Sequence, residues 1–370
     1  MTVGASAFTS PSPSRLRPFG RYLLTGGVLV LLFVGLALRP RAGPDPRLAE
    51  REFIAMSTLM SISVYRDTNQ TDAEVERALD AAQAQLRDDE RDWSAWGDGA
   101  LAALNQTLAA GKAVTIPQPL RPLFARAALY GQRSEGRFDV RIGRLIALWG
   151  FDDERHFRSQ PPPPAARAAA LADLHAAPAL DAAATTYGPA PGVHFDFGAI
   201  AKGDAVDRVV ARLRDAGFAH VIVNAGGNLR AAGRRGDRAW RIGIRHPRPD
   251  AGSQLLATLE IDGDEAVVTS GDYERGFEFE GRRYHHLIDP FSGEPARGLQ
   301  AVTVVADNAA LADAASTALF IAGPQHWRSL VGRLGLDRVM VVTDDGRVHA
   351  TPRLAARLRY ADGIAATVAP

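Results

Sequence analysis

Several short segments of the chain alternate apolar and polar residues with a period of two, which predicts half-buried β-strands. The clearest example has Met60, Ile62 and Val64 separated by Ser61 and Ser63. Further strands are expected at residues 220–224, 240–244, 255–261, 266–269, 277–279, 283–287, 302–305 and 339–342. Glu280-Gly281, between two of these, is typical of a hairpin turn.

Other segments place apolar residues at helical spacing. The residues Thr71-Asp72-Ala73-Glu74 form a capping box, and apolar positions follow it at 75, 79, 82 and 86. Further helices are expected at 101–110, 122–133, 200–216 and 311–322, and the proline- and alanine-rich segment 152–192 predicts a surface helix with a loop. Because strands and helices come in mixed order, the sequence favours an α+β (mixed α/β) fold over a doubly wound parallel sheet.

The N-terminus has a pattern of its own. Residues 22–38 carry no charge and are flanked by arginines, so we expect a short cytoplasmic leader (1–21), a transmembrane signal anchor or signal peptide (22–38) and a linker (39–50). A buried helix of the domain is the third interpretation of this run. The excess of positive charge before it favours a bacterial inner-membrane protein whose domain, residues 51–360, faces the periplasm.

Composition narrows the class of protein. The 370 residues include 43 Lys plus Arg and 42 Asp plus Glu, so no charge excess points to nucleic acid. Apolar residues make up 46% of the chain, which allows a large core. The chain has no cysteine, which excludes disulfides, thiolate zinc sites, Fe–S clusters and a lipid-modified cysteine.

The helix at 311–322 carries the strongest candidate chemistry. Asp313, Ser316 and Thr317 lie three and four residues apart, so their oxygens share one face. Mg²⁺ prefers such oxygen ligands, with waters and substrate phosphates completing its shell. The alternative is a solvated helix face, although the apolar neighbours indicate that this helix is buried.

Three other segments carry candidate groups. Residues 196–203 place glycines and Lys202 at the start of a helix, where phosphates bind readily, and residues 224–228 form a second glycine-rich break after a strand. His286 titrates near neutrality when unperturbed and could accept a hydroxyl proton or orient a phosphate, with Asp289 close in sequence. His285 is expected on the opposite face, and a purely structural role for His286 stays open.

Together these segments resemble the ApbE family, the FAD:protein FMN transferases. The resemblance spans roughly residues 52–333. It rests on Met56-Ser57-Thr58, residues 136–140 and 148–151, residues 196–207, residues 223–227, residues 269–273, residues 286–290 and residues 312–319.

The resemblance implies an enzyme that moves the FMN half of FAD onto a Ser or Thr hydroxyl of a target protein, with Mg²⁺ as cofactor and AMP as the second product. It implies catalytic roles for His286 and Asp313, and metal ligands from Asp313, Thr317, Ser316 and the carbonyl of Ala199. The residues implied to contact FAD are Met56, Trp96, Arg137, Phe138, Asp139, Asp196, Lys202 and Ile288.

Two alternatives accompany this hypothesis. Water could replace the protein acceptor, which would make the chain a Mg²⁺-dependent FAD pyrophosphatase. The chain could also be a flavin-binding accessory protein of metalloenzyme maturation without turnover, although a pure binder would not need Asp313, Thr317 and His286 together. The expected acceptor is a membrane or periplasmic redox protein.

Overall fold

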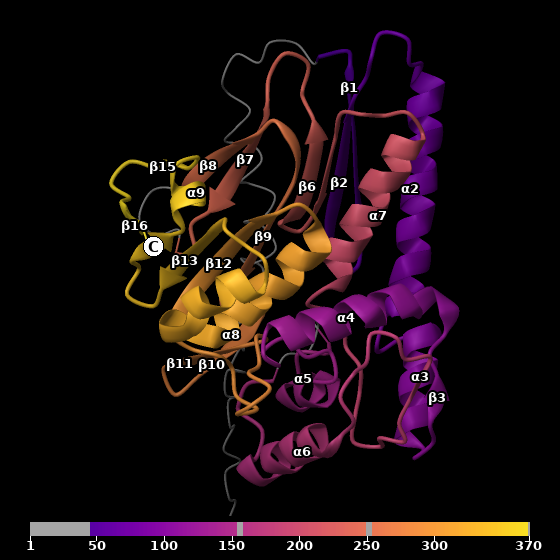
Figure 1. The fold of residues 1–370 in the computed structure, drawn as a ribbon, viewed down its shortest axis with the longest axis vertical. Coiled ribbons are helices and arrows are strands. Elements are labelled where there is room, and N and C mark those ends of the chain that lie inside the picture. The colour runs from indigo at the N-terminus through magenta and orange to yellow at the C-terminus, as the bar shows by residue number, and fades with distance from the viewer. Residues whose placement is uncertain (1–44, 154–157, 249–253, 369–370) are drawn as a thin grey trace, which may run out of the picture. The chain divides into compact units, whose positions relative to one another are not determined.

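The computed structural model describes residues 45–153, 158–248 and 254–368, and from Arg47 onward the chain forms one compact unit. Its main element is a nine-stranded sheet with the strand order β1-β2-β5-β6-β9-β12-β13-β14-β16 (Figure 1). The strands are β1 (Leu48–Ala55), β2 (Thr58–Tyr65), β5 (Val221–Ala225), β6 (Asn228–Gly233), β9 (Gly263–Gly271), β12 (Leu299–Ala306), β13 (Val339–Thr343), β14 (Val348–Ala350) and β16 (Ala366–Val368).

Neighbouring strands of this sheet pair antiparallel, except that β14 and β16 are parallel. Antiparallel neighbours can be joined by tight hairpins, whereas a doubly wound sheet needs a crossover helix between its parallel strands. The structure therefore confirms the predicted mixture of strands and helices and the preference over a parallel sheet.

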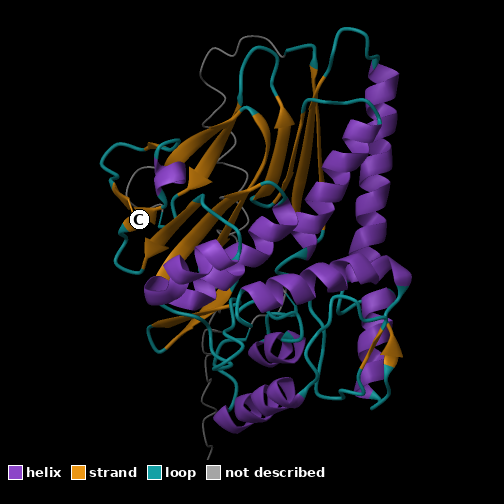
Figure 2. Ribbon diagram, in the orientation of Figure 1, coloured by secondary structure: helices purple, strands orange, loops and turns teal. Residues whose placement is uncertain are grey.

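The two faces of the sheet are covered differently (Figure 2). Helices α2 (Asp72–Trp93), α7 (Ala201–Asp215) and α8 (Ala309–Arg333) pack on one face over the main apolar core. A three-stranded sheet, β15-β8-β7, covers part of the other face over a second core. Its strands are β7 (Trp240–Arg245), β8 (Leu255–Ile261) and β15 (Arg359–Tyr360), with the short helix α9 (Pro352–Ala355) nearby.

A smaller, mainly helical part lies below the sheet in the view of Figure 1. It contains α3 (Ala100–Ala109), the 3-10 turn Gln118–Leu120, α4 (Arg121–Arg133), α5 (Gly143–Trp149), α6 (Pro164–Ala176) and the strand pair β3 (Val114–Thr115) and β4 (Thr186–Tyr187). The hairpin β10 (Gly276–Phe279) and β11 (Arg282–His285) packs Phe277 and Tyr284 against Trp149 in a third apolar cluster.

Most predicted elements are present, with some differences in extent. The capping box at Thr71 is formed, and the helix predicted at 311–322 continues to Arg333 across a kink at Gly323-Pro324. Seven strands of the described residues were not predicted: β1, β6 and the short strands β3, β4, β14, β15 and β16. The strand β1 begins at Leu48, inside the predicted linker, and its consecutive charged residues interrupt the period of two. The strand β6 follows directly after the glycine-rich break. At the other end β16 runs to Val368, beyond the expected limit at residue 360.

The predicted membrane segment, residues 22–38, lies outside the described residues. Among the residues that are described, no helix combines the length and the apolar character needed to cross a bilayer.

Candidate functional site

The buried polar face of α8 forms the centre of the candidate site. Asp313 is 4% exposed, Ser316 is fully buried and Thr317 is 8% exposed, so the alternative of a solvated helix face is wrong. The hydroxyl of Ser270, at the end of β9, lies 2.8 Å from Ser316 Oγ and 3.4 Å from Thr317 Oγ1. The predicted i, i+3, i+4 spacing thus gathers these groups against the sheet, as expected.

The carboxylate of Asp313 meets the first turn of α7. The backbone N–H of Gly203 donates to Asp313 Oδ2 at 3.0 Å. This contact requires a glycine, because a Cβ at position 203 would lie 2.3 Å from the carbonyl oxygen of Ala309. Asp207, one turn further along α7, accepts the backbone N–H groups of Ala309 and Ala310 at 2.8 and 2.9 Å and so caps the N-terminus of α8.

Burial raises the pKa of Asp313, because the charged carboxylate is removed from water. The positive charge of Lys202, the Gly203 N–H and the Asn228 side chain oppose this rise. The buried amide nitrogen of Asn228 is near enough to act on this carboxylate, although it makes no hydrogen bond of standard geometry among the described residues. A buried carboxylate is costly unless further interactions stabilise its charge.

The oxygen atoms at this point suit a hard cation. The Gly203 N–H donates to Asp313, so the helical hydrogen bond that would engage the carbonyl of Ala199, four residues earlier, is not formed. One carboxylate, the hydroxyls of Ser316 and Thr317 and this carbonyl fit Mg²⁺, which binds few protein oxygens and keeps waters or phosphate oxygens. Within the described residues no group of three or more His, Asp or Glu side chains is arranged to hold a metal.

His286 lies just after β11 and is partly buried. Removal from water is the main cause that lowers its pKa well below the usual value, and the charges of Arg275 and Lys202 add to it, so the neutral ring is favoured. The His286 Nδ1 atom is 3.3 Å from the carbonyl oxygen of Arg275. A carbonyl only accepts, so Nδ1 carries the proton and Nε2 is left as a proton acceptor.

His285 and Asp289 fix the loop that carries His286. His285 is buried and donates from Nε2 to the carbonyl of Ala296 at 2.9 Å, which ties the two ends of the loop together. Asp289 accepts from the Phe291 N–H and the Ser292 hydroxyl. Asp289, which is close to His286 in sequence, therefore shapes the turn, since both of these partners lie in it.

Lys202 lies near both Asp313 and His286. Its Nζ atom donates to the carbonyl of Gly198 at 3.2 Å, and its charge acts on both Asp313 and His286. Asp196, four residues before Ile200, accepts the Gly198 N–H at 2.6 Å and so shapes the turn that leads into α7. The glycine-rich junction at 196–203 thus lies beside the carboxylate, as the sequence predicts.

Two hairpin turns meet beside this junction at one end of the sheet. Met56 and Ser57 connect β1 to β2 with φ angles of 52° and 56°, a left-handed pair that non-glycine residues adopt only at a cost. The Met56 N–H donates to Glu90 Oε1 at 2.8 Å, which holds the turn. The neighbouring turn at Gly226 approaches so closely that a Cβ there would lie 2.1 Å from Thr58 Oγ1.

The remaining residues predicted to contact FAD differ in how exposed their side chains are. Trp96 is 41% exposed and stacks on His194 with ring centroids 4.3 Å apart, so its outer face is open to a flat ligand. Arg137 pairs with Glu135 at 3.0 Å and lies over the exposed ring of Phe291.

Three of the predicted contacts are engaged within the protein. The side chains of Phe138 and Ile288 are 2% and 1% exposed, and Asp139 pairs with Arg141 at 2.7 Å. For Phe138 and Ile288 a ligand contact would therefore come from the backbone, because apolar packing already uses the side chains. Trp149 and Phe151, from the segment 148–151 of the resemblance, are fully buried in the third apolar cluster.

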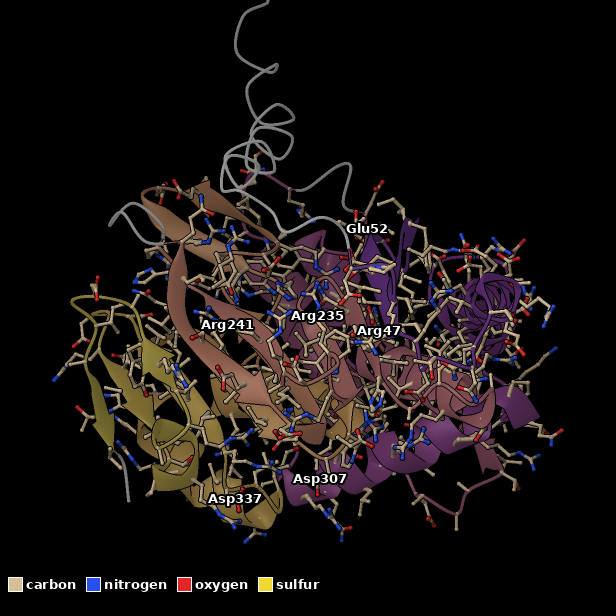
Figure 3. The ribbon with its side chains drawn as sticks, turned by 90° about the horizontal axis from the view of Figure 1, so that it is seen from above. Arg47, Glu52, Arg235, Arg241, Asp307 and Asp337 are labelled. Carbon is tan, nitrogen blue, oxygen red and sulfur yellow. The ribbon has the colours of Figure 1, made fainter. Side chains whose placement is uncertain are left out.

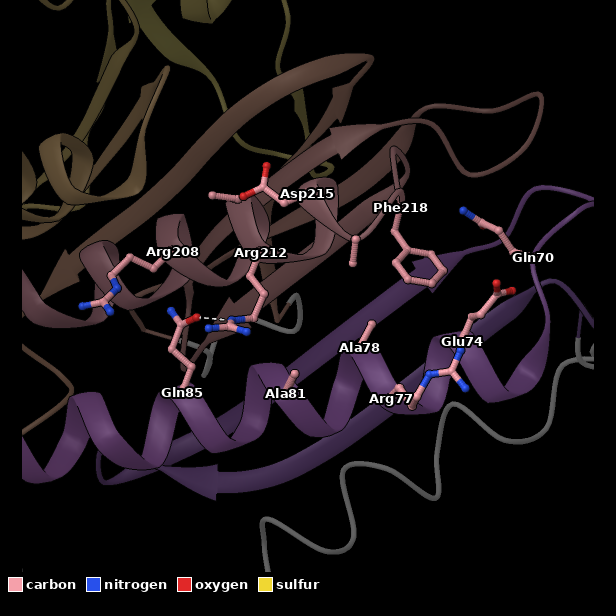
Figure 4. Close-up of a pocket in the computed structure, with 12 residues that line it drawn as sticks. Gln70, Glu74, Arg77, Ala78, Ala81, Gln85, Arg208, Arg212, Asp215 and Phe218 are labelled. Atoms are coloured by element: carbon pink, nitrogen blue, oxygen red, sulfur yellow. Dashed lines mark hydrogen bonds between the residues drawn. The ribbon is translucent and has the colours of Figure 1, made fainter.

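A groove of about 790 Å³ between α2 and α7 contains none of the predicted site residues (Figure 4). Its alanine-lined floor is flanked by Arg77, Arg208 and Arg212, and the Arg212 guanidinium donates to Gln85 across it. The predicted site residues therefore lie away from this groove.

Sequence reasoning did not name Ser270, Asn228 or Gly203 as site residues. All three lie in segments that the sequence singled out, at 269–273, 224–228 and 196–203. Their roles depend on contacts across long sequence separations, such as 110 residues between Gly203 and Asp313, and single-sequence spacing does not report these.

Comparisons with known proteins agree with this arrangement. Residues 56–340 match the model of the ApbE family. An FAD:protein FMN transferase of Rhodobacter capsulatus is 35% identical over 347 residues, which cover 92% of this chain and 62% of the relative. An FAD:protein FMN transferase of Treponema pallidum (strain Nichols) is 34% identical over 360 residues, which cover 91% of this chain and 95% of the relative.

Solved structures show the same fold. The ApbE protein of Thermotoga maritima has a TM-score of 0.73 at 28% identity, over 84% of this chain and 99% of that one. The flavin transferase ApbE of Vibrio cholerae has a TM-score of 0.72 at 25% identity with the same coverage. With its sequence match extending across the strands, helices and turns that form the site, the chain belongs to the ApbE family.

Proposed function

We propose that this chain is a magnesium-dependent FAD:protein FMN transferase, which moves FMN from FAD to a Ser or Thr hydroxyl of an acceptor protein and releases AMP. The observation that carries this proposal is the buried carboxylate of Asp313, placed between the α8 hydroxyls and the first turn of α7 with Lys202 nearby. The names of the two curated relatives support the same activity.

The metal would be held by Asp313, Thr317, Ser316 and the carbonyl of Ala199. A bound Mg²⁺ neutralises charge on the diphosphate and on the departing phosphate. The chain's own groups bind and orient the substrate: Lys202 adds positive charge beside the diphosphate, and the left-handed turn at Met56 with the exposed ring of Trp96 offers backbone and aromatic contacts for FAD.

The transfer exchanges one P–O bond for another. The acceptor hydroxyl oxygen bonds to the phosphorus of the FMN half, and the bond from that phosphorus to the bridging oxygen breaks, so that AMP leaves with the bridging oxygen. His286 supports the step because its neutral ring keeps Nε2 as an acceptor for the hydroxyl proton.

The setting of the reaction is also part of the proposal. Residues 22–38 would anchor the chain in the bacterial inner membrane with the domain on the periplasmic side, where a membrane or periplasmic redox protein would be the acceptor. The cysteine-free sequence supports an anchor of this kind over a lipid-modified cysteine.

A direct experiment separates transfer from hydrolysis. The purified chain is incubated with FAD, Mg²⁺ and candidate acceptor proteins, and the products are analysed by mass spectrometry. We expect an acceptor that gains the mass of one FMN through a phosphoester, together with one AMP per FMN transferred. If AMP appears with free FMN and no adduct on any acceptor, the chain is an FAD pyrophosphatase instead.

A further inference from the structure

The strand β1 forms an edge of the main sheet and is the feature that the site chemistry leaves unexplained. Among the described residues it pairs with β2 alone, from Leu48 opposite Tyr65 to Ala55 opposite Thr58. The outer N–H and C=O groups of such a strand can pair with another extended chain, so proteins usually protect exposed edges with charges. Figure 3 shows Glu52 at the surface of the molecule.

The protection of β1 stops before the strand ends. Glu50, Arg51 and Glu52 place three consecutive charges in the middle of β1, and Arg51 is paired with Glu76 and Asp80 of α2. The next residues are Phe53, Ile54 and Ala55, without a charge. Ile54 is 74% exposed, and its cross-strand partner Leu59 on β2 is 45% exposed. The end of β1 that has no charged residues therefore carries an exposed apolar pair.

This apolar pair lies at the end of the sheet where the site is assembled. Ile54 and Leu59 flank the left-handed turn at Met56 and Ser57. Thr58, the residue after that turn, lies against Gly226, and the Gly226 N–H donates to the Leu59 carbonyl at 3.1 Å. Gly226 comes two residues before Asn228, whose side chain acts on the pKa of Asp313. With strands about 4.8 Å apart, β1 is separated from β6 by about 14 Å.

We propose that the acceptor polypeptide docks as an additional strand along the edge of β1. This inference rests on the proposed function, since only a polypeptide substrate needs such a surface. Main-chain hydrogen bonds to β1 supply the binding, and side chains at alternate positions supply the selectivity. An apolar side chain of the acceptor covers Ile54 and Leu59, and a basic side chain two positions away faces Glu52.

The same geometry places the modified hydroxyl away from the docked strand. The added strand lies one spacing beyond β1, about 19 Å from β6, and an extended residue covers about 3.3 Å. The acceptor must therefore continue about six residues past Ala55 before its Ser or Thr reaches the site. The docking segment and the modified residue are thus separate parts of the acceptor sequence.

The test compares three full-length proteins: the parent, Ile54→Lys and Val368→Lys. Val368 is the matched control, because it is 53% exposed on β16, the opposite edge strand of the same sheet. Each protein is mixed with FAD, Mg²⁺ and an extract of source cells that lack this gene. Covalent flavin is then measured as fluorescent bands on a denaturing gel, and FAD affinity is measured separately by flavin fluorescence.

We expect Ile54→Lys to lower the initial rate of covalent labelling by roughly tenfold or more, because it removes one buried apolar contact and places a charge on the edge. Val368→Lys should label like the parent, and all three should bind FAD equally. A charge reversal, Glu52→Lys, should also slow labelling, and the loss should shrink as salt is added.

Two results overturn the inference while leaving the proposed function intact. One is equal labelling by Ile54→Lys and the parent, and the other is faster labelling by Ile54→Lys, which would mean that an inhibitory segment covers the edge. If the parent labels no band, the proposed function fails and the docking inference falls with it.

Discussion

At the scale of single residues, the site depends on how burial changes the charge state of its side chains. Removal from water shifts the pKa values of Asp313 and His286 in opposite directions: it raises the pKa of the carboxyl and lowers that of the imidazole. The charged form of the Asp313 carboxyl therefore depends on nearby positive charge, and the neutral form of the His286 ring is favoured. Lys202 alone supplies positive charge to both, and a divalent ion would supply more.

His285 gives this argument a consequence for stability. Burial lowers its pKa from 6.5 to about 4, so the folded protein keeps it neutral while the unfolded chain takes up a proton below pH 6.5. The stabilisation by this group is complete above pH 6.5 and is lost as the pH falls toward 4. Between pH 7.5 and 5 we expect it to lower the free energy of unfolding by about 2 kcal/mol.

This prediction is checked by urea unfolding of the parent and of His285→Gln at both pH values. The variant has no titrating ring, so its free energy of unfolding should fall by about 2 kcal/mol less than that of the parent between pH 7.5 and 5. At pH 7.5 we expect the variant to be less stable than the parent. Parallel losses in the two proteins would show that the imidazole is not held neutral.

At the scale of elements, the crossing of α7 and α8 decides whether the site forms. The two helices approach at Gly203, where Ala309 leaves no room for a side chain, and Asp207 caps the start of α8. The position of Asp313 therefore depends on a backbone contact rather than on its own side chain.

Gly203→Ala tests the crossing. Alanine favours a helix by up to about 1 kcal/mol over glycine, but here its Cβ would collide with a backbone oxygen, so we expect a net loss of about 1–3 kcal/mol. Gly332→Ala is the matched control, because a Cβ added to this α8 glycine would meet no described atom outside its own helix backbone within 4 Å, so this variant should gain stability. The test is to measure the thermal unfolding midpoint of both variants and of the parent. A Gly203→Ala variant more stable than the parent would contradict the close crossing of α7 and α8.

The elements also show what sequence can and cannot predict. The capping box at Thr71 and the spacing of Asp313, Ser316 and Thr317 are local patterns, and the structure contains both. The strand β1 was not predicted because its charged residues break the alternation of apolar and polar positions. The strand β6 was not predicted because its alternation begins directly after two glycines. The contacts of Ser270 and Asn228 with the site could not be predicted, since these residues come from strands distant in sequence from α8.

At the scale of the whole molecule, one end of the main sheet collects groups from distant segments. The turns after β1 and β5, the end of β9 and the starts of α7 and α8 all meet there. The sheet and its three covering helices form the rigid support, and the smaller helical part contributes the exposed ring of Trp96. This arrangement gathers backbone turns, hydroxyls and a carboxylate at one end of the sheet, and the described part of the chain has no cluster of three or more His, Asp or Glu side chains there.

The most direct measurement of the central claim is AMP release from FAD as a function of Mg²⁺ concentration. It compares the parent with Asp313→Ala and with Asp307→Ala, whose exposed carboxylate pairs with Arg338 outside the site. We expect saturable Mg²⁺ dependence in the parent and in Asp307→Ala, and a rate at least about 100-fold lower in Asp313→Ala at millimolar Mg²⁺. If Asp313→Ala releases AMP as fast as the parent, the α8 carboxylate does not hold the metal.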